Sequence, residues 1–192
     1  MSRSSGSDLI PLSKYSSGDV QIARLKLEHA NLLGAFSSRD GELNEFLQKD
    51  ALEYQKLHLG VTYLLLDRTC SRVISYITLS MGSLKVPDHK EFVLRGRKLA
   101  DYPKDFPMQF PALLIGRLAT DRKEEGRGGA HILLDLAVEM ALKTREDMGC
   151  GFLLAHAVAD ERVVGWYKKS GFKAFVDSVA GRETVPMYFE LG

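Results

Sequence analysis

Apolar residues alternate with polar ones, or recur at helical spacing, in short segments along the whole chain. Alternation and short β-branched runs predict strands, whereas apolar residues three or four positions apart predict helices. The predicted strands occupy 20–25, 61–66, 73–79, 112–119, 152–158 and 185–191. The predicted helices occupy 42–58, about 128–147, and 161–170. This mixture and order of elements predicts a mixed α/β domain.

Residues at the ends of these segments support several of the boundaries. Asp40 is a suitable N-cap for the helix over 42–58, and Glu42 lies in its first turn. Gly171 is a suitable C′ residue for the helix over 161–170. The polar segment 67–72 joins two strands and predicts a hairpin.

Two regions carry no clear periodicity. Residues 1–19 predict a flexible N-terminal segment, so one domain is expected over 20–192. Residues 83–111 contain four prolines and mixed charge, which predicts a long connecting loop with a short helix around 92–99. Loops of that length within a domain are often functional.

Composition excludes several classes of protein. The chain has 192 residues, of which 45% are hydrophobic and 27% charged, as in a globular domain and unlike a disordered chain. The longest apolar stretches, such as 110–115, are far shorter than a membrane-spanning helix requires. The net charge of +1 gives no global argument for nucleic-acid binding, which leaves only local basic groups. These groups are Lys90, Arg95, Arg97 and Lys98 in the long connection, and Lys168, Lys169 and Lys173 near the last helix.

Cysteine and histidine spacing gives no sign of a metal or disulfide framework. Cys70 and Cys150 are too few, and the five histidines form no HExxH pair. No bound metal is expected. The N-terminus has no apolar segment of the secretory type, so a cytoplasmic protein is expected.

The strongest chemical signal is a glycine-rich turn between the strand over 112–119 and the following long helix. Backbone N–H groups at Gly126, Arg127, Gly128, Gly129 and Ala130 would point out of the helix N-terminus, where they suit a phosphate. Arg122 and Arg127 would add charge-assisted hydrogen bonds. Neither GxxxxGK[ST] nor GxGxxG occurs, and a merely tight strand-to-helix turn is the alternative interpretation.

Two motifs in the expected order resemble those of the GNAT superfamily of N-acetyltransferases. Glu125-Gly-Arg-Gly128-Gly-Ala130 resembles the Q/R-x-x-G-x-G/A acyl-CoA motif, with Glu125 as a departure at its first position. Trp166-Tyr167-Lys-Lys-Ser-Gly171-Phe172 resembles the YxxxGF segment.

A narrower resemblance covers nearly the whole chain from about Leu25. Its segments are Gly41-Glu-Leu-Asn44-Glu-Phe-Leu47, Tyr76-Ile-Thr-Leu-Ser80-Met-Gly-Ser83, Ile115-Gly-Arg117-Leu-Ala119-Thr-Asp121 and Asp160-Glu-Arg162. They are similar to a GNAT branch that includes toxins of toxin–antitoxin pairs, which acetylate the amino group of aminoacyl-tRNA. The resemblance implies a small ribbon-helix-helix antitoxin as a possible partner and a homodimer as a possible assembly.

The resemblance also implies a fold and a site. The fold is a mixed, mostly antiparallel sheet flanked by helices, with a V-shaped split between two central parallel strands. Acetyl-CoA would lie in that split, its pantetheine arm along Leu118, Ala119 and Thr120 and its pyrophosphate on the glycine turn. A primary amine would attack the thioester directly, and a backbone N–H near Leu118 or Ala119 would polarise the carbonyl.

Tyr167 is the candidate general acid for the departing thiolate, because a tyrosine of ordinary pKa is protonated at neutral pH. The alternative is a core aromatic residue packed with Trp166. The base is left open among Glu53, Glu161, His156 and an ordered water chain, and His156 is expected to be a buried, satisfied histidine.

Four further residues are candidates for the substrate side: Arg117, Ser80, Arg95 and Arg97. Arg117 has a second interpretation, in which it simply alternates to a solvated face. Asp160 either lines the cofactor cleft or, as is favoured here, caps the helix that follows.

The resulting hypothesis is an acetyl-CoA-dependent N-acetyltransferase acting on the α-amino group of aminoacyl-tRNA. The alternatives are an acetyltransferase for a small-molecule or protein amine, and a non-catalytic acyl-CoA-binding module.

Overall fold

The computed structural model describes residues 14–16, 18–86, 92–102, 109–175 and 179–192. Within these ranges a seven-stranded sheet has the order β1-β2-β3-β6-β7-β9-β8. Its strands are β1 Val20–Arg24, β2 Val61–Asp67, β3 Val73–Lys85, β6 Gln109–Thr120, β7 Phe152–Val158, β8 Lys173–Ala174 and β9 Thr184–Glu190. All neighbours are antiparallel except β6 and β7. The mixed α/β architecture is therefore confirmed.

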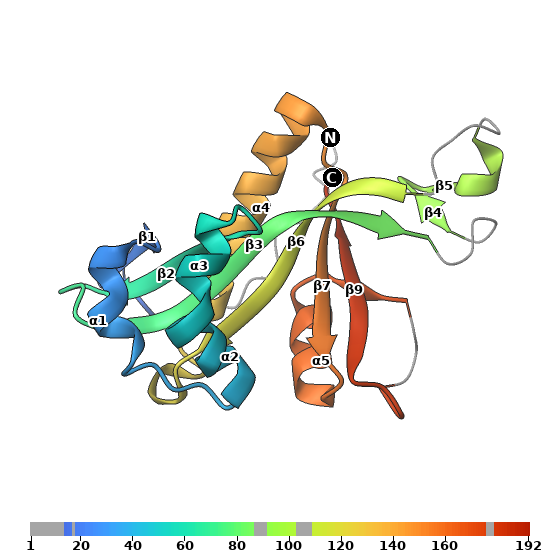
Figure 1. Ribbon diagram of the computed structural model, residues 1–192. Helices are drawn as coiled ribbons and strands as arrows, with labels where there is room; N and C mark the ends of the chain where they lie inside the picture. Colours follow the sequence, from blue (N-terminus) through green and yellow to red (C-terminus); the bar gives the residue numbers. More distant parts are fainter. Residues whose placement is uncertain (1–13, 17, 87–91, 103–108, 176–178) are drawn as a thin grey trace, which may run out of the picture.

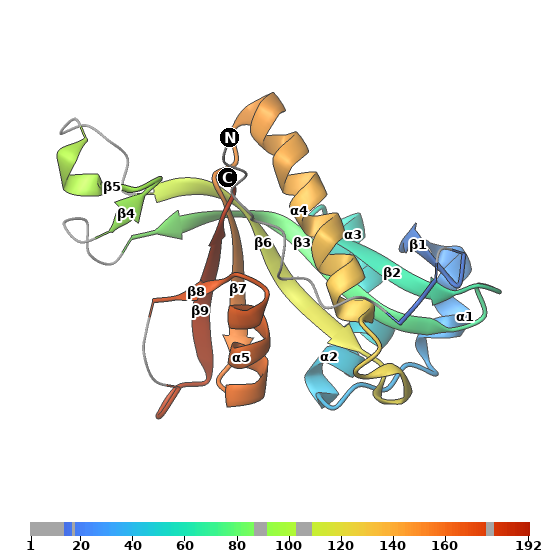
Figure 2. The same cartoon turned by 180° about the vertical axis from the view of Figure 1, so that it is seen from behind.

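Helices cover both faces of the sheet (Figures 1 and 2). On one face lie α1 Ala30–Leu33, α2 Gly41–Glu45 and α3 Ala51–Lys56, and a π-helical turn at Phe46–Asp50 joins the last two. On the other face lie α4 Gly129–Met148 and α5 Glu161–Lys169. The predicted helix over 42–58 thus exists, with a wider turn in its middle. No helix within the described ranges is both long and apolar enough to span a membrane.

Apolar packing secures each layer separately. One core cluster, which includes Leu133, Ala137 and Leu153, fills the space between the sheet and the α4–α5 face. A second, which includes Phe46, Leu64 and Tyr76, lies beneath α1–α3. Full burial of a leucine or phenylalanine side chain contributes about 1.5–3 kcal/mol. Two separately packed layers leave the sheet between them as the rigid support for the site.

The long connection differs from its prediction. β3 extends to Lys85 and β6 begins at Gln109, and the two pair as far as Lys85↔Gln109, so both ends of the stretch 83–111 are strand. The expected helix around 92–99 is wrong, because β4 Val93–Leu94 and β5 Arg97–Lys98 form a hairpin there. Arg95 and Gly96 both have positive φ (49° and 78°), as the tight turn of a two-residue hairpin requires. Residues 87–91 and 103–108 lie outside the described residues.

The N-terminal segment is attached to the domain at Tyr15. Its hydroxyl donates a 2.8 Å hydrogen bond to Glu124, and the backbone N–H of Lys14 donates to the carbonyl of Arg127. These contacts lie within the range expected to be flexible, of which residues 1–13 and 17 are outside the described residues. Residues 14 and 15 of the N-terminal segment therefore contact the glycine turn and the residues just before it.

Candidate active site

The centre of the sheet opens where β6 leaves β7. Their parallel register covers only Ala112↔Phe152 to Ile115↔Ala155, whereas both strands continue beyond it. In Figure 1 the two strands diverge toward the lower part of the view. Residues 116–120 of β6 therefore keep β3 on one edge, and no strand of the described residues pairs with the other edge. Such an edge exposes backbone N–H and C=O groups to a ligand.

A β-bulge in β6 coincides with this opening. Thr78 pairs with Arg117 and Leu79 with Ile115, which leaves Gly116 as the extra residue. A bulge reverses the alternation of side chains downstream of it. Ile115 accordingly packs in the α4–α5 layer, whereas Arg117, two residues later, lies against Phe46 on the opposite face. The second interpretation of Arg117, simple alternation to a solvated face, is therefore wrong.

A cavity of about 880 Å³ occupies the opening. Its walls are β6, the loop and helix start at 38–43, the glycine turn, the end of β7, and α5. Nine of the predicted cofactor residues line it: Leu118, Ala119, Thr120, Gly126, Arg127, Gly128, Gly129, Ala130 and Asp160. The open edge of β6, the glycine turn and α5 thus surround one cavity. Such a cavity suits a ligand with an extended arm and an anionic end.

The glycines of the turn serve two different purposes. Gly126 and Gly128 have φ of +70° and +94°, a region that disfavours other residues. Gly129 is instead needed for close packing, since an added Cβ would lie 2.6 Å from the Ser75 Oγ. The turn therefore both shapes the backbone and brings the start of α4 against β3.

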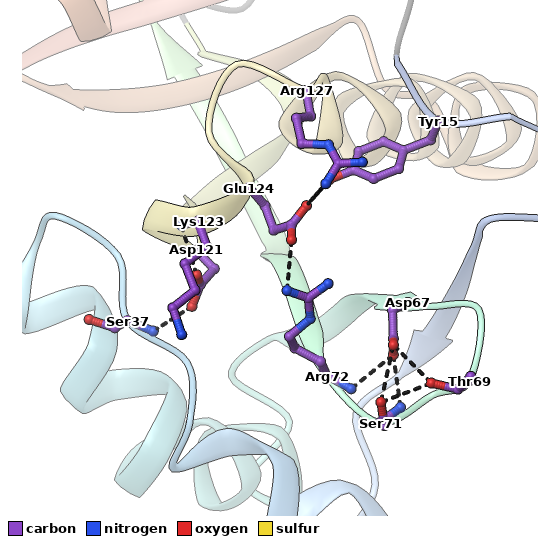
Figure 3. Close-up of polar contacts among 10 residues, drawn as sticks. All are labelled: Tyr15, Ser37, Asp67, Thr69, Ser71, Arg72, Asp121, Lys123, Glu124 and Arg127. Carbon is purple, nitrogen blue, oxygen red and sulfur yellow. Dashed lines mark hydrogen bonds and ion pairs between the residues drawn. The ribbon is translucent and has the colours of Figure 1, made fainter.

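Glu124 is the buried anchor of the turn (Figure 3). Its carboxylate, 3% exposed, accepts from the Tyr15 hydroxyl and pairs with Arg72 and Arg127, each at 2.8 Å. Arg127 also lies over the Tyr15 ring. The Arg127 guanidinium is thus directed toward Glu124 and Tyr15. Arg127 also lines the cavity, and the charge-assisted role of its side chain stays a prediction.

Arg122 also differs from its prediction, because it does not line the cavity. Its Nε donates to the Ser38 carbonyl, and its backbone N–H donates to that of Ser37. The neighbouring Asp121 accepts from the Ser37 N–H at 2.9 Å. Arg122 and Asp121 therefore fasten the 37–38 loop to the end of β6, which fixes the two walls of the cavity relative to each other.

Glu125, the departure from the acyl-CoA motif, is paired with Arg39. The Arg39 Nε donates to both carboxylate oxygens at 2.8 and 2.9 Å, and Nη2 lies 2.7 Å from Oε2. Hydrogen bonding to Arg39 holds the pKa of the Glu125 carboxyl below its ordinary value, so the carboxylate is ionised at neutral pH. The acidic side chain beside the turn is thus compensated by a cation from the opposite wall, which sequence reasoning missed.

Tyr167 is 7% exposed, and its ring packs edge-on against Trp166 and Phe172 at 5.0 and 5.1 Å. Burial raises the pKa of its hydroxyl above the ordinary value of a tyrosine. Within the described residues no group hydrogen-bonds to this hydroxyl, and no buried side-chain oxygen lacks a partner. The hydroxyl must therefore open to the cavity that the residue lines. The ring is thus part of the core, as the alternative interpretation expects, and the oxygen faces the site. The role of Tyr167 as the general acid stays a prediction.

The histidines of the site differ from expectation. His156 is exposed and lines the cavity, so the prediction of a buried histidine is wrong. Of the side chains considered as the base, it lines the cavity, whereas Glu53 and Glu161 do not. His131, which sequence reasoning missed, also lines the cavity and packs on Trp166 at 4.8 Å. Burial lowers the pKa of His131, which favours its neutral form.

Asp160 is confirmed as the N-cap of α5. It accepts from the N–H groups of Arg162 and Val163, and hydrogen bonds from Arg162 keep its pKa low. Since it also lines the cavity, both interpretations of this residue apply.

Three of the proposed substrate residues lie elsewhere. Ser80 is on β3 opposite Leu114, outside the cavity. Arg95 and Arg97 belong to the β4–β5 hairpin, where Arg97 stacks on Tyr102. Arg117 does line the cavity. Among the described residues no group of three or more His, Cys, Asp or Glu is placed to hold a metal ion.

A curated relative, the tRNA-acetylating toxin of Mycobacterium tuberculosis, is 31% identical over 139 residues, which cover 71% of this chain and 75% of the relative. The chain belongs to the toxin branch of the GNAT acetyltransferases. It is therefore an N-acetyltransferase with acetyl-CoA as cosubstrate. No family model matches the chain.

Solved structures of GNAT toxins confirm the fold. A tyrosine-to-phenylalanine mutant of KacT has a TM-score of 0.74 at 18% identity, over 90% of this chain and 95% of that one. AtaT complexed with acetyl-methionyl-tRNAfMet has a TM-score of 0.71 at 24% identity, over 90% and 95%. AtaT bound to the C-terminus of the antitoxin AtaR and acetyl-CoA has a TM-score of 0.67 at 21% identity, over 90% and 94%.

Proposed function

We propose that this GNAT protein transfers the acetyl group of acetyl-CoA to the α-amino group of aminoacyl-tRNA and thereby acts as a toxin that blocks translation. The observation that carries the proposal is the cavity between the diverging strands, which joins an anion-binding turn to a tyrosine hydroxyl. The relative from M. tuberculosis, a tRNA-acetylating toxin, supports the choice of acceptor.

The backbone of this chain supplies binding and polarisation of the donor. The residues of the turn at 126–130 line the cavity, and the N–H groups of such a turn suit a pyrophosphate. The open edge at 118–120 suits an extended amide chain. A backbone N–H at Leu118 or Ala119 stabilises the negative charge that develops on the thioester oxygen. Holding donor and acceptor together in the cavity lowers the entropic part of the barrier.

Two side chains, Tyr167 and His156, are assigned to the proton transfers of the reaction. As the amine nitrogen bonds to the thioester carbon and the carbon–sulfur bond breaks, Tyr167 gives its proton to the departing sulfur and is reprotonated from solvent. The proton of the amine passes to solvent, and His156 is the candidate base that lines the cavity. Tyr167 and His156 reach the cavity from α5 and β7, two adjacent elements of the chain.

A transfer assay tests the acceptor. Labelled acetyl-CoA is incubated with the protein and a pool of charged tRNA, with deacylated tRNA and a mixture of free amines run alongside. Label on charged tRNA alone, recovered as N-acetyl-aminoacyl esters, is the expected result. Label on free amines or on protein lysines, with none on charged tRNA, would replace the proposed acceptor by a small-molecule or protein amine.

We further propose a small ribbon-helix-helix antitoxin as the partner of this chain. A structure of AtaT with its antitoxin AtaR supports a partner of this kind. Expression of the chain alone is then expected to arrest growth. A neighbouring gene is expected to encode a small ribbon-helix-helix protein, and its co-expression to restore growth. Normal growth on expression of an active enzyme would contradict the toxin role.

The Arg39–Glu125 pair gives a prediction about the donor. Arg39→Ala leaves the Glu125 carboxylate uncompensated beside the phosphate-binding turn, and we expect acetyl-CoA to bind about 2- to 5-fold more weakly, since exposed ion pairs are modest and screened by salt. Isothermal titration at low and high salt measures the effect. Glu125→Gln in the Arg39→Ala background is expected to restore affinity. Persistence of the loss in that double variant would mean that Arg39 acts by another route.

A further inference from the structure

Arg117 differs from the other arginines of the cavity in what it contacts. Among the described residues four arginines line the cavity, and three of them pair with carboxylates: Arg39 with Glu125, Arg127 with Glu124, and Arg162 with Asp160. The Arg117 guanidinium instead lies over the Phe46 ring at 3.7 Å and 5.4 Å from the centre of the Tyr54 ring. No carboxylate of the described residues pairs with it.

The position of Arg117 is fixed by the fold. The bulge at Gly116 turns it to the α2–α3 face, and Phe46 beneath it is 6% exposed and packs edge-on against Tyr54. Stacking on aromatic rings uses the flat faces of a guanidinium and leaves its N–H edges for hydrogen bonds. The half-buried guanidinium thus lies on one wall of the cavity, held in a position from which its N–H groups can donate hydrogen bonds to a ligand.

Arg117 stands at the end of the cavity away from the donor phosphates. Along β6 it precedes Leu118–Thr120, and the glycine turn follows Thr120 after the short 3₁₀ helix Arg122–Glu124. The anionic end of the donor lies at the turn in the proposed function, so Arg117 lies toward the reacting end, where the acceptor enters. An α-amino group and an ester carbonyl carry no negative charge. The nearest anion of a charged tRNA is the phosphodiester on the 5′ side of its terminal nucleoside.

Resting on the proposed function, we propose that Arg117 is a specificity-determining residue that binds this phosphodiester through its N–H edges. Arginine forms two parallel hydrogen bonds with a phosphate and retains its charge at all relevant pH values. The contact would place the terminal nucleoside so that the attached α-amino group meets the thioester. It would also favour nucleotide-linked amines over free amines of similar size.

The test uses two small acceptors that differ only by the phosphate: 3′-O-aminoacyl adenosine and its 5′-monophosphate. Arg117→Met keeps the apolar stem and removes the donors. We expect kcat/KM for the phosphorylated acceptor to fall about 10- to 100-fold, as for loss of a hydrogen bond to a charged group, and that for the unphosphorylated acceptor to change less than about 2-fold. Arg117→Lys is expected to recover part of the loss.

A matched control and a second readout separate this role from a structural one. Arg68→Met removes an equal charge from an exposed position of the β2–β3 turn and is expected to leave both acceptors unaffected. For charged tRNA, the slope of log(kcat/KM) against log salt concentration is expected to become less negative by about 0.7 in Arg117→Met, the value for one phosphate contact on a single strand. An equal fall on both acceptors would overturn the role of Arg117. Absence of transfer by the wild type to every aminoacyl acceptor would overturn the proposed function, and this inference with it.

Discussion

Tyr167→Phe is expected to lower kcat by about 100- to 1,000-fold and to leave the affinity for acetyl-CoA unchanged. The substitution removes only the hydroxyl, and with it the proton for the departing thiolate, a contribution typical of general acid catalysis. The ring stays, and its edge-on contacts with Trp166 and Phe172 hold the core of α5 in place. Steady-state kinetics with charged tRNA and calorimetric titration of acetyl-CoA measure the two quantities.

Tyr63→Phe is the matched control, since this partly buried tyrosine on β2 does not line the cavity. Its kcat is expected to equal that of the wild type. If Tyr167→Phe also retains wild-type turnover, Tyr167 has no part in the proton transfer. If acetyl-CoA affinity falls as far as kcat does, the hydroxyl binds the donor and is not the acid.

The same residue determines one limb of the pH profile. A general acid acts while protonated, and burial raises the pKa of Tyr167 above its ordinary value. The Tyr167 hydroxyl therefore deprotonates at a higher pH than the hydroxyl of an exposed tyrosine. We expect no alkaline decline of kcat from this group below about pH 10, the ordinary value for tyrosine. A decline centred near neutral pH that disappears in Tyr167→Phe would contradict this assignment of the raised pKa.

Local sequence signals were sufficient to predict the elements that line the donor half of the cavity. The glycine turn, the strand before it and the cap of α5 each depend on residues close together in the chain, so spacing and residue type predict them. Asp160 illustrates this, because the N–H groups that it caps belong to residues two and three positions later.

Contacts between segments far apart in the chain could not be predicted in the same way. Arg39 meets Glu125 across a separation of 86 residues, and Tyr15 meets Glu124 across 109. Nothing in the spacing along one sequence specifies such contacts. The bulge at Gly116 is not visible in the sequence, because the apolar run over 112–119 predicts one continuous buried strand, and the extra residue transfers Arg117 to the other face. The turn at Arg95–Gly96 was missed because a hydrophobic run that short is compatible with either a helix or a strand.

Glu124→Ala is expected to lower the free energy of unfolding by about 3 kcal/mol. The substitution leaves Arg72 and Arg127 facing each other without the carboxylate that both contact at 2.8 Å, and removes the acceptor of the Tyr15 hydroxyl. Loss of one partner of a buried ion pair typically costs about 3–5 kcal/mol. The lower end applies here because both arginines are 46% exposed and can turn toward solvent. Urea denaturation followed by circular dichroism measures the change, with Glu139→Ala on the exposed side of α4 as a control expected within about 0.5 kcal/mol of the wild type.

The affinity of the Glu124 variants for acetyl-CoA shows whether Glu124 holds the glycine turn in place or only adds to the stability of the fold. Glu124 lies two residues before Gly126 and contacts both Arg127 and Tyr15 (Figure 3). Without the Glu124 carboxylate, these two side chains no longer hold the backbone of the turn in place. Acetyl-CoA affinity is then expected to fall about 10-fold at a temperature where the variant remains folded, because a turn that must be ordered on binding loses its pre-organisation. Glu124→Gln, which still accepts a hydrogen bond, is expected to lie between Glu124→Ala and the wild type in both measurements. Wild-type affinity in a destabilised Glu124→Ala would show that the glycine turn is held by its own backbone conformation, without the cluster beneath it.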